Sequence, residues 1–168
     1  FKKWAYIRLN KFIAENKKLF QESNITNPHA EDTFGISGIC FTRKSLMALT
    51  SVSDYWQDNF TIEYLARQAE LIKQGVHIQR VFILEQGGYE KAKDQMEYQK
   101  NLGIEVFYIY KGDQFIDPDW LEEDYLIQDG ELLVQIYCNT HQFVGQDKCS
   151  EEITMDKARV SIMIERFR

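Results

Sequence analysis

The segment from Tyr64 to Leu84, YLARQAELIKQGVHIQRVFIL, constrains the fold more than any other part of this chain. Apolar residues recur at helical spacing before Gly75, and an almost continuous apolar run follows it. Glycine directly after a last helical turn is a usual C-cap, because it adopts the left-handed backbone conformation without steric cost. A nearly continuous apolar strand is typical of a sheet covered on both faces. The segment therefore predicts a helix, a glycine stop and a buried strand, which is half of a βαβ unit.

The preceding residues extend this helix toward its beginning. Polar residues in SVSDYWQDNF come just before it, and Asp58 or Asn59 is placed to act as the N-cap. The spacing predicts one apolar helical face made of Ile62, Leu65, Ala66, Ala69 and Ile72.

The same pattern repeats after Gly87 and Gly88. The sequence predicts a second helix from Tyr89 to Leu102 that ends at Gly103, followed by a strand from Ile104 to Tyr110. Gly35 to Thr42 (GISGICFT), a short apolar run between turn residues, predicts an earlier buried strand.

Beyond Lys111 the pattern changes to two apolar runs joined at Asp129-Gly130, which is a strong hairpin signal. A polar stretch from Asn139 to Glu152 follows. The last segment predicts a helix, although alternating apolar residues leave a strand open. The expected fold class is α/β, a three-layer α/β/α domain with a mixed, mostly parallel central sheet and a C-terminal hairpin.

We expect residues 1–22 to form an N-terminal helix or connector, Ser23 to Thr33 a loop, and residues 35–168 a single α/β domain. The chain begins at Phe1 rather than Met, so we expect a domain of a longer protein.

Composition narrows the function classes. The formal net charge of -6 argues against nucleic acid as a partner, since nucleic-acid binders carry a dominant basic face. No apolar run is long enough to span a bilayer, which argues against a membrane location. The three cysteines, Cys40, Cys138 and Cys149, are odd in number and far apart, which predicts reduced, buried thiols in a cytoplasmic protein.

The order of these segments resembles one half of the phospholipase D-like phosphodiesterase fold. LIKQGVHIQRVFIL and NLGIEVFYI are similar to two successive helix–strand steps of that family, and YLIQDGELLVQI is similar to the strand pair that carries its catalytic motif. The resemblance covers roughly Gly35 to Tyr137 and depends on the order of the pieces.

The resemblance implies a His-x-Lys-x-x-x-x-Asp motif ending just before the hairpin glycine, with histidine as nucleophile and lysine on the phosphate. Counting back from Asp129 places Glu122 at the histidine position and Asp124 at the lysine position. Two carboxylates supply no imidazole and repel a phosphodiester, so the resemblance implies loss of the family's activity.

No catalytic motif, metal site or cofactor fingerprint is evident elsewhere. Cys138 and His141 have a spacing that zinc sites use, but Cys138 ends an apolar run where thiols are commonly core residues. The acidic residues from Asp117 to Asp124 are a solvated loop or a divalent-cation cluster. We therefore predict no catalytic residue, no metal and no cofactor.

Ligands of α/β sheets bind beyond the carboxyl ends of the strands. This rule selects Arg43, Lys44, Lys111 and His141 as candidates for a small anionic ligand, and Tyr55 and Trp56 are added as aromatic neighbours. Arg43 and Lys44 would bind the anion, and the rings of Tyr55 and Trp56 would form a wall on which a ligand stacks. The alternative is that Arg43 and Lys44 are ordinary exposed charges at the start of a helix, and that Tyr55 and Trp56 pack over the domain as a lid.

These observations favour a non-catalytic regulatory, ligand-sensing or protein-interaction domain of a larger cytoplasmic protein. One alternative is a phosphodiesterase or nuclease with another site, for example His141 with Lys111. A second alternative is a self-association module that forms a homodimer.

Overall fold

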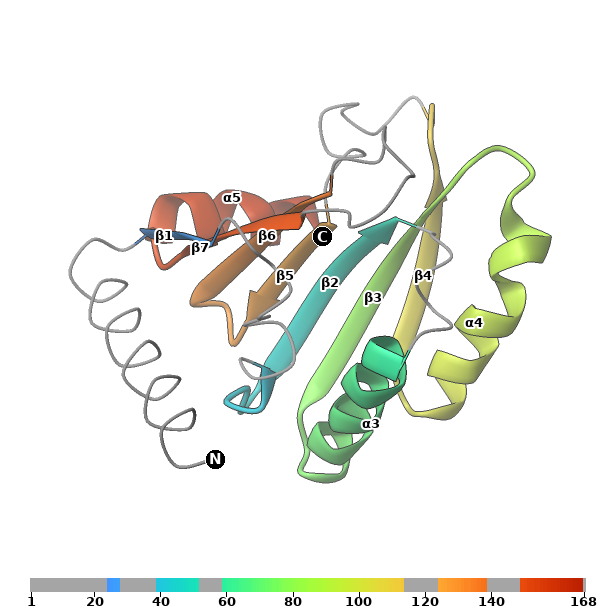
Figure 1. The fold of residues 1–168 in the computed structure, drawn as a ribbon, viewed down its shortest axis with the longest axis horizontal. Coiled ribbons are helices and arrows are strands. Elements are labelled where there is room, and N and C mark those ends of the chain that lie inside the picture. Colours follow the sequence, from blue (N-terminus) through green and yellow to red (C-terminus); the bar gives the residue numbers. More distant parts are fainter. Residues whose placement is uncertain (1–23, 28–38, 52–58, 114–123, 139–148, 168) are drawn as a thin grey trace.

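A computed structural model of the protein describes residues 24–27, 39–51, 59–113, 124–138 and 149–167. The two predicted helix–strand steps are present. Helix α3 (Asn59–Lys73) leads into strand β3 (His77–Leu84), and helix α4 (Tyr89–Asn101) leads into strand β4 (Glu105–Tyr110). Figure 1 shows the two units side by side.

Glycine ends both helices by the predicted mechanism. Gly75 has φ +90, its N–H donates to the carbonyl of Ile72, and the next N–H donates to that of Leu71. Gly103 has φ +95 and an equivalent pair of hydrogen bonds. This is the Schellman arrangement, which satisfies carbonyls that would otherwise be unpaired at a helix end. A Cβ on Gly103 would also lie 3.2 Å from Ile72 Cγ2, so this glycine allows the two units to approach closely.

The described strands form one seven-stranded sheet in the order β1-β7-β6-β5-β2-β3-β4. Its remaining members are β1 (Asn24–Asn27), β2 (Ser45–Ser51), β5 (Asp124–Gln128), β6 (Leu132–Cys138) and β7 (Cys149–Thr154). The mixed sheet was predicted, but the expectation that it is mostly parallel is wrong for its pairings. Among the described strands, only β2–β3 and β3–β4 pair in parallel, because the hairpin strands, β7 and β1 are all joined to the sheet by antiparallel pairing.

The hairpin between β5 and β6 turns at the predicted residues. Asp129 has φ 53 and Gly130 has φ 72, which is the pair of positive angles that a type I′ turn requires. The turn carries the chain from Gln128 to Leu132, which are register partners in the two strands.

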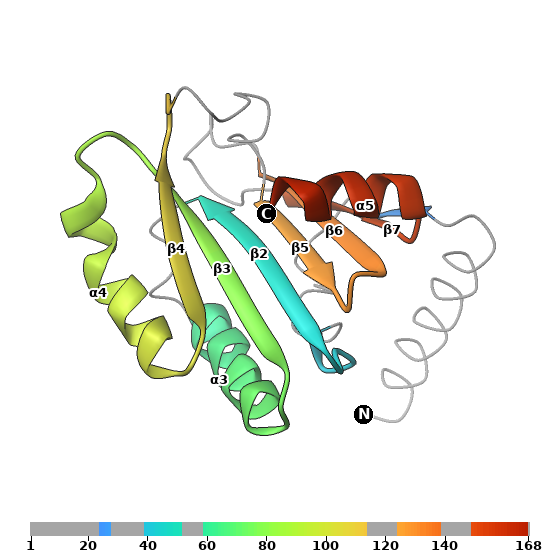
Figure 2. The same cartoon turned by 180° about the vertical axis from the view of Figure 1, so that it is seen from behind.

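Helices cover both faces of the sheet, which confirms the three-layer α/β/α class. Leu65 and Leu71 of α3 pack with Leu46 and Ile78 of the sheet, and α4 packs against the same face. Helix α5 (Lys157–Arg166) covers the opposite face through Val160 and Met163. Figures 1 and 2 show these two faces in turn. The C-terminal segment is thus a helix, and the alternative strand is excluded.

The first predicted strand is wrong in its position. The described part of the segment, Ile39 to Thr42, is not extended; the N–H of Thr42 donates to the carbonyl of Ile39 at 3.0 Å and closes a turn. Ile39 is fully buried there, so this apolar residue packs into the core from a turn and does not belong to a strand. The strand is the following segment, Ser45–Ser51.

The apolar face predicted for α3 is also partly wrong. The side chain of Ile62 is 61% exposed and Ala66 is exposed, whereas Leu65, Gln68 and Leu71 are buried. The buried face of α3 includes the polar residue Gln68. A pattern of apolar residues alone therefore assigns the buried face to the wrong positions.

Two strands lie in segments for which no strand was predicted. Strand β1 lies within the predicted loop, and β7 lies partly within the predicted polar stretch. Both have polar sequences, NITN and CSEEIT, and they are held by antiparallel pairing with their neighbours. Backbone pairing of this kind leaves no hydrophobic signature.

The expectation of buried thiols is wrong for Cys40, which is exposed. Cys138 and Cys149 are direct register partners on β6 and β7. The N-terminal helix predicted for residues 1–22 lies outside the described residues, and the division of the chain into residues 1–22 and 35–168 stays a prediction. None of the described helices is long and apolar enough to cross a membrane.

Candidate functional site

The aspartate that the motif comparison retains, Asp129, is bound to backbone. Its carboxylate accepts the N–H of Lys44 at 2.7 Å, that of Ser45 at 3.0 Å, and that of Arg43 at 3.0 and 3.1 Å. Burial tends to raise the pKa of Asp129, but the N–H groups of Ser45, Lys44 and Arg43 outweigh it and the pKa lies below its ordinary value. Asp129 therefore holds the turn that precedes β2 to the hairpin.

Asp124, which the resemblance puts at the motif's lysine position, is the first residue of β5 and is partly exposed. Its charge acts on a buried guanidinium, that of Arg80 on β3, whose side chain is 1% exposed. Burial lowers the pKa of Arg80, and Tyr64 and Asp124 oppose that decrease. An acidic residue thus stands near a buried cation at this position.

Helix α3 holds the guanidinium from the other side. Arg80 Nη2 donates to Gln68 Oε1 at 3.0 Å, and Arg80 Cζ lies 5.5 Å from the centroid of the Tyr64 ring. Burial raises the pKa of Tyr64, so its phenol stays neutral at ordinary pH. We call Tyr64, Gln68, Arg80 and Asp124 the Arg80 cluster. It joins α3 to the sheet and offers no activated nucleophile, because its phenol is disfavoured as phenolate and guanidinium is a poor base.

The predicted anion site is not assembled as expected. Because β2 begins only at Ser45, Arg43 and Lys44 lie at the amino end of the parallel strands. Lys111 follows the carboxyl end of β4, at the opposite edge of the sheet. Tyr55, Trp56 and His141 lie outside the described residues. The idea that one edge gathers all six residues is wrong, and the ligand-binding role of each remains a prediction.

At the carboxyl edge of β3 and β4, Lys111 contacts two polar residues that follow β3. Lys111 Nζ lies 2.7 Å from Glu85 Oε1, and Gln86 Nε2 donates to the Lys111 carbonyl at 3.2 Å. Both charged side chains of this pair are exposed, so the ion pair contributes little to stability. It does reduce the free positive charge that Lys111 presents to an anion.

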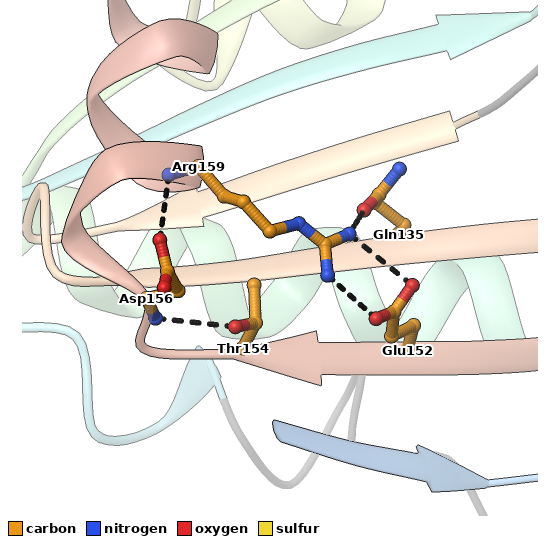
Figure 3. Close-up of polar contacts among 5 residues, drawn as sticks. All are labelled: Gln135, Glu152, Thr154, Asp156 and Arg159. Carbon is orange, nitrogen blue, oxygen red and sulfur yellow. Dashed lines mark hydrogen bonds and ion pairs between the residues drawn. The ribbon is translucent and has the colours of Figure 1, made fainter. Parts of the chain in front are cut away.

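A second polar cluster, which the sequence analysis missed, lies at the start of α5 (Figure 3). Arg159 Nη1 lies 2.6 Å from Glu152 Oε1, and Arg159 Nη2 donates to Gln135 Oε1. The Asp156 carboxylate caps the helix by accepting the N–H of Arg159 at 2.9 Å. The Thr154 hydroxyl accepts the N–H of Asp156 at 3.1 Å. The cluster ties α5 to β6 and β7, and the N-cap aspartate three residues before Arg159 was the available sequence signal.

Within the part of the chain that the structure describes, no group of three or more His, Cys, Asp or Glu side chains is placed to hold a metal ion.

Comparison with known proteins identifies the fold. No protein-family model and no curated protein sequence matches the chain. The structure is similar to that of TrmBL2, an archaeal chromatin protein with a novel mode of DNA binding, with a TM-score of 0.52 and 13% identity. This similarity covers 99% of the present chain, which spans only 58% of the TrmBL2 chain.

Two further similar structures are those of Nuc and NucT. Nuc, a phospholipase D family member from Salmonella typhimurium, has a TM-score of 0.54 and 15% identity over 86% of this chain and 90% of its own. NucT from Helicobacter pylori has a TM-score of 0.58 and 12% identity over 86% of this chain and 91% of its own. The chain therefore has a phospholipase D-like fold, as its segment order suggested. Identities this low establish the fold alone.

Proposed function

We propose that the chain is a non-catalytic regulatory, ligand-sensing or protein-interaction domain of a larger protein. The observation that carries this proposal is the state of the two aspartates at the motif positions. Asp129 is bound by three backbone N–H groups, and Asp124 stands where an active relative has a phosphate-binding lysine.

Charge supports this proposal. A phosphodiester is an anion, and a carboxylate at the lysine position repels it. The cation of the Arg80 cluster, the Arg80 guanidinium, is buried and hydrogen-bonded to Gln68. Its charge therefore acts inside the domain and does not face a ligand. An arrangement of this kind maintains the fold and leaves recognition to other surfaces.

The similarity to TrmBL2 supports the idea of a module within a longer chain, since this chain corresponds to 58% of that one. TrmBL2 binds DNA, which places our prediction against nucleic acid in doubt. With a net charge of -6, we propose that DNA contact would come from another segment of a longer protein. A cytoplasmic location is part of the proposal and rests on the odd, widely spaced cysteines.

Thermal melting with inorganic phosphate and with nucleotides tests the ligand-sensing form of the proposal. A ligand that binds only the folded protein raises the melting temperature in a concentration-dependent way. Lys111→Ala should reduce the rise, whereas Lys73→Ala on α3 serves as a control for general loss of positive charge. An equal rise in wild type and Lys111→Ala would remove Lys111 from the ligand site.

Hydrolysis assays separate the proposal from the enzyme alternative. The chain should leave bis(p-nitrophenyl) phosphate and single-stranded DNA intact in an assay run beside Salmonella Nuc. Cleavage by the wild type that His141→Ala abolishes would establish a phosphodiesterase instead.

A further inference from the structure

Strand β4 forms one edge of the sheet, and among the described residues no strand pairs with its outer side. Both views of the fold show it at the side of the sheet opposite β1 (Figures 1 and 2). Its sequence, EVFYIY, has one charged residue and no proline. Phe107 is 51% exposed and Tyr108 is 46% exposed, and they point to opposite faces. Such an edge lacks the charges and prolines that normally prevent pairing with another chain.

The hydrogen bonds show which backbone groups face outward. The N–H of Lys111 donates to the Leu84 carbonyl at 2.8 Å, so odd-numbered residues of this strand point their backbone groups toward β3. Val106, Tyr108 and Tyr110 therefore point theirs outward, because these groups alternate along a strand. The Tyr110 N–H is taken by Asp113 Oδ2 at 3.2 Å, and its carbonyl accepts the Asp113 N–H. Asp113 thus closes the end of the edge and leaves Val106 and Tyr108 facing outward.

Opposite charges lie at the two ends of this edge. Glu105 begins β4 and pairs with His77 Nε2 at 2.9 Å, while Lys111 follows its end and pairs with Glu85 at 2.7 Å. Lys111 directly follows β4, and its N–H continues the ladder to Leu84, so the alternation of the strand puts Glu105 and Lys111 on the same face. A second copy running antiparallel therefore brings the negative end of one strand toward the positive end of the other.

We propose that this edge binds a second copy of the chain and forms an antiparallel β4–β4 pair about a two-fold axis. In the register that uses both outward-facing residues, Val106 lies opposite Tyr108 of the partner subunit, and each such pair exchanges two N–H···O bonds. Phe107 then faces Phe107 of the partner subunit across the axis. These are non-hydrogen-bonded positions, where side chains approach most closely.

The same register places Glu105 diagonally opposite Lys111 of the partner subunit, within reach of these long side chains. Each end of the interface then holds one pair of opposite charges. A two-fold interface must be self-complementary, and this edge meets that requirement in hydrogen bonding, aromatic surface and charge. The inference concerns assembly, and its outcome does not depend on whether the chain is catalytic.

Sedimentation over a concentration series tests the interface. The wild type should show a monomer–dimer equilibrium. Phe107→Lys and Tyr108→Pro should each weaken association by roughly tenfold or more, the proline because it removes an outward N–H from both copies. Ile162→Lys, which replaces an apolar side chain 55% exposed on α5, should leave association unchanged. A thermal melt establishes that each variant is folded, and Phe107→Lys suffices if the proline variant is not.

Charge reversal tests the register. Glu105→Lys and Lys111→Glu should each weaken association, and the double variant should restore it. A wild type that is monomeric throughout, or a dimer unaffected by Phe107→Lys, overturns the proposal. A dimer lost in Phe107→Lys but not rescued by the double charge reversal overturns the register.

Discussion

Replacing Asp129 with alanine tests how the turn before β2 is held. The change removes the acceptor for the N–H groups of Arg43, Lys44 and Ser45 and leaves alanine at φ 53. Water reaches the first two N–H groups, so each lost bond costs about 0.5 kcal/mol there and about 1 kcal/mol at the part-buried Ser45. Alanine in the left-handed region adds about 1 kcal/mol. The free energy of unfolding should therefore fall by about 3 kcal/mol.

Urea denaturation followed by circular dichroism measures this change. Asp129→Asn is the matched control, because asparagine tolerates the left-handed conformation and keeps one acceptor oxygen. It should cost about 1 kcal/mol, from the loss of charge in hydrogen bonds to the backbone. An alanine variant within about 0.5 kcal/mol of wild type, the range of ordinary surface changes, would refute the reasoning.

The pH dependence of the unfolding free energy also tests the role of the Asp129 carboxylate. The pKa of Asp129 is lowered from its ordinary value of 3.8, so its contribution to stability is fully present above that pH. It is lost as the pH falls through the lower folded-state pKa, since the carboxylate becomes protonated. The gap in unfolding free energy between wild type and Asp129→Asn should shrink in that acid range. A gap that stays constant down to acid-induced unfolding contradicts the assignment.

Three further changes test other parts of the fold by urea denaturation. Gly103→Ala should cost more than Gly75→Ala by about 1 kcal/mol, because both have positive φ but only the added Cβ at Gly103 approaches Ile72; equal costs would contradict the close approach. Asp156→Ala should cost about 1 kcal/mol through loss of the α5 N-cap, and no change would show that the cap is dispensable. Arg80→Ala should cost about 3 kcal/mol or more, while Arg80→Met, which fills similar space, should cost less than half of that; equal losses would show that the charge itself is required.

The elements predicted correctly are those whose signals are local. Gly75 and Gly103 each follow directly on the helix they end, and Asp129-Gly130 specifies its turn from two adjacent residues. Local signals of this kind also gave the order of segments that resembles the phospholipase D-like fold.

The errors in predicted strands and buried faces arise where a residue far away in the sequence determines the local structure. The start of β2 depends on Asp129, which is 86 residues away from Arg43. Gln68 occupies a core position because Arg80 on another element binds it. Neither relation has a local pattern. The prediction put Arg43 and Lys44 at the same sheet edge as Lys111 because it placed the first strand before these two residues instead of after them.

The most direct test of the central claim is the rate of phosphodiester hydrolysis by the purified chain, measured beside Salmonella Nuc with bis(p-nitrophenyl) phosphate. We predict a rate equal to the protein-free blank, because the proposed motif register puts Asp124 in the place of the phosphate-binding lysine. Turnover above the blank that remains through repeated purification and disappears in His141→Ala would contradict the account.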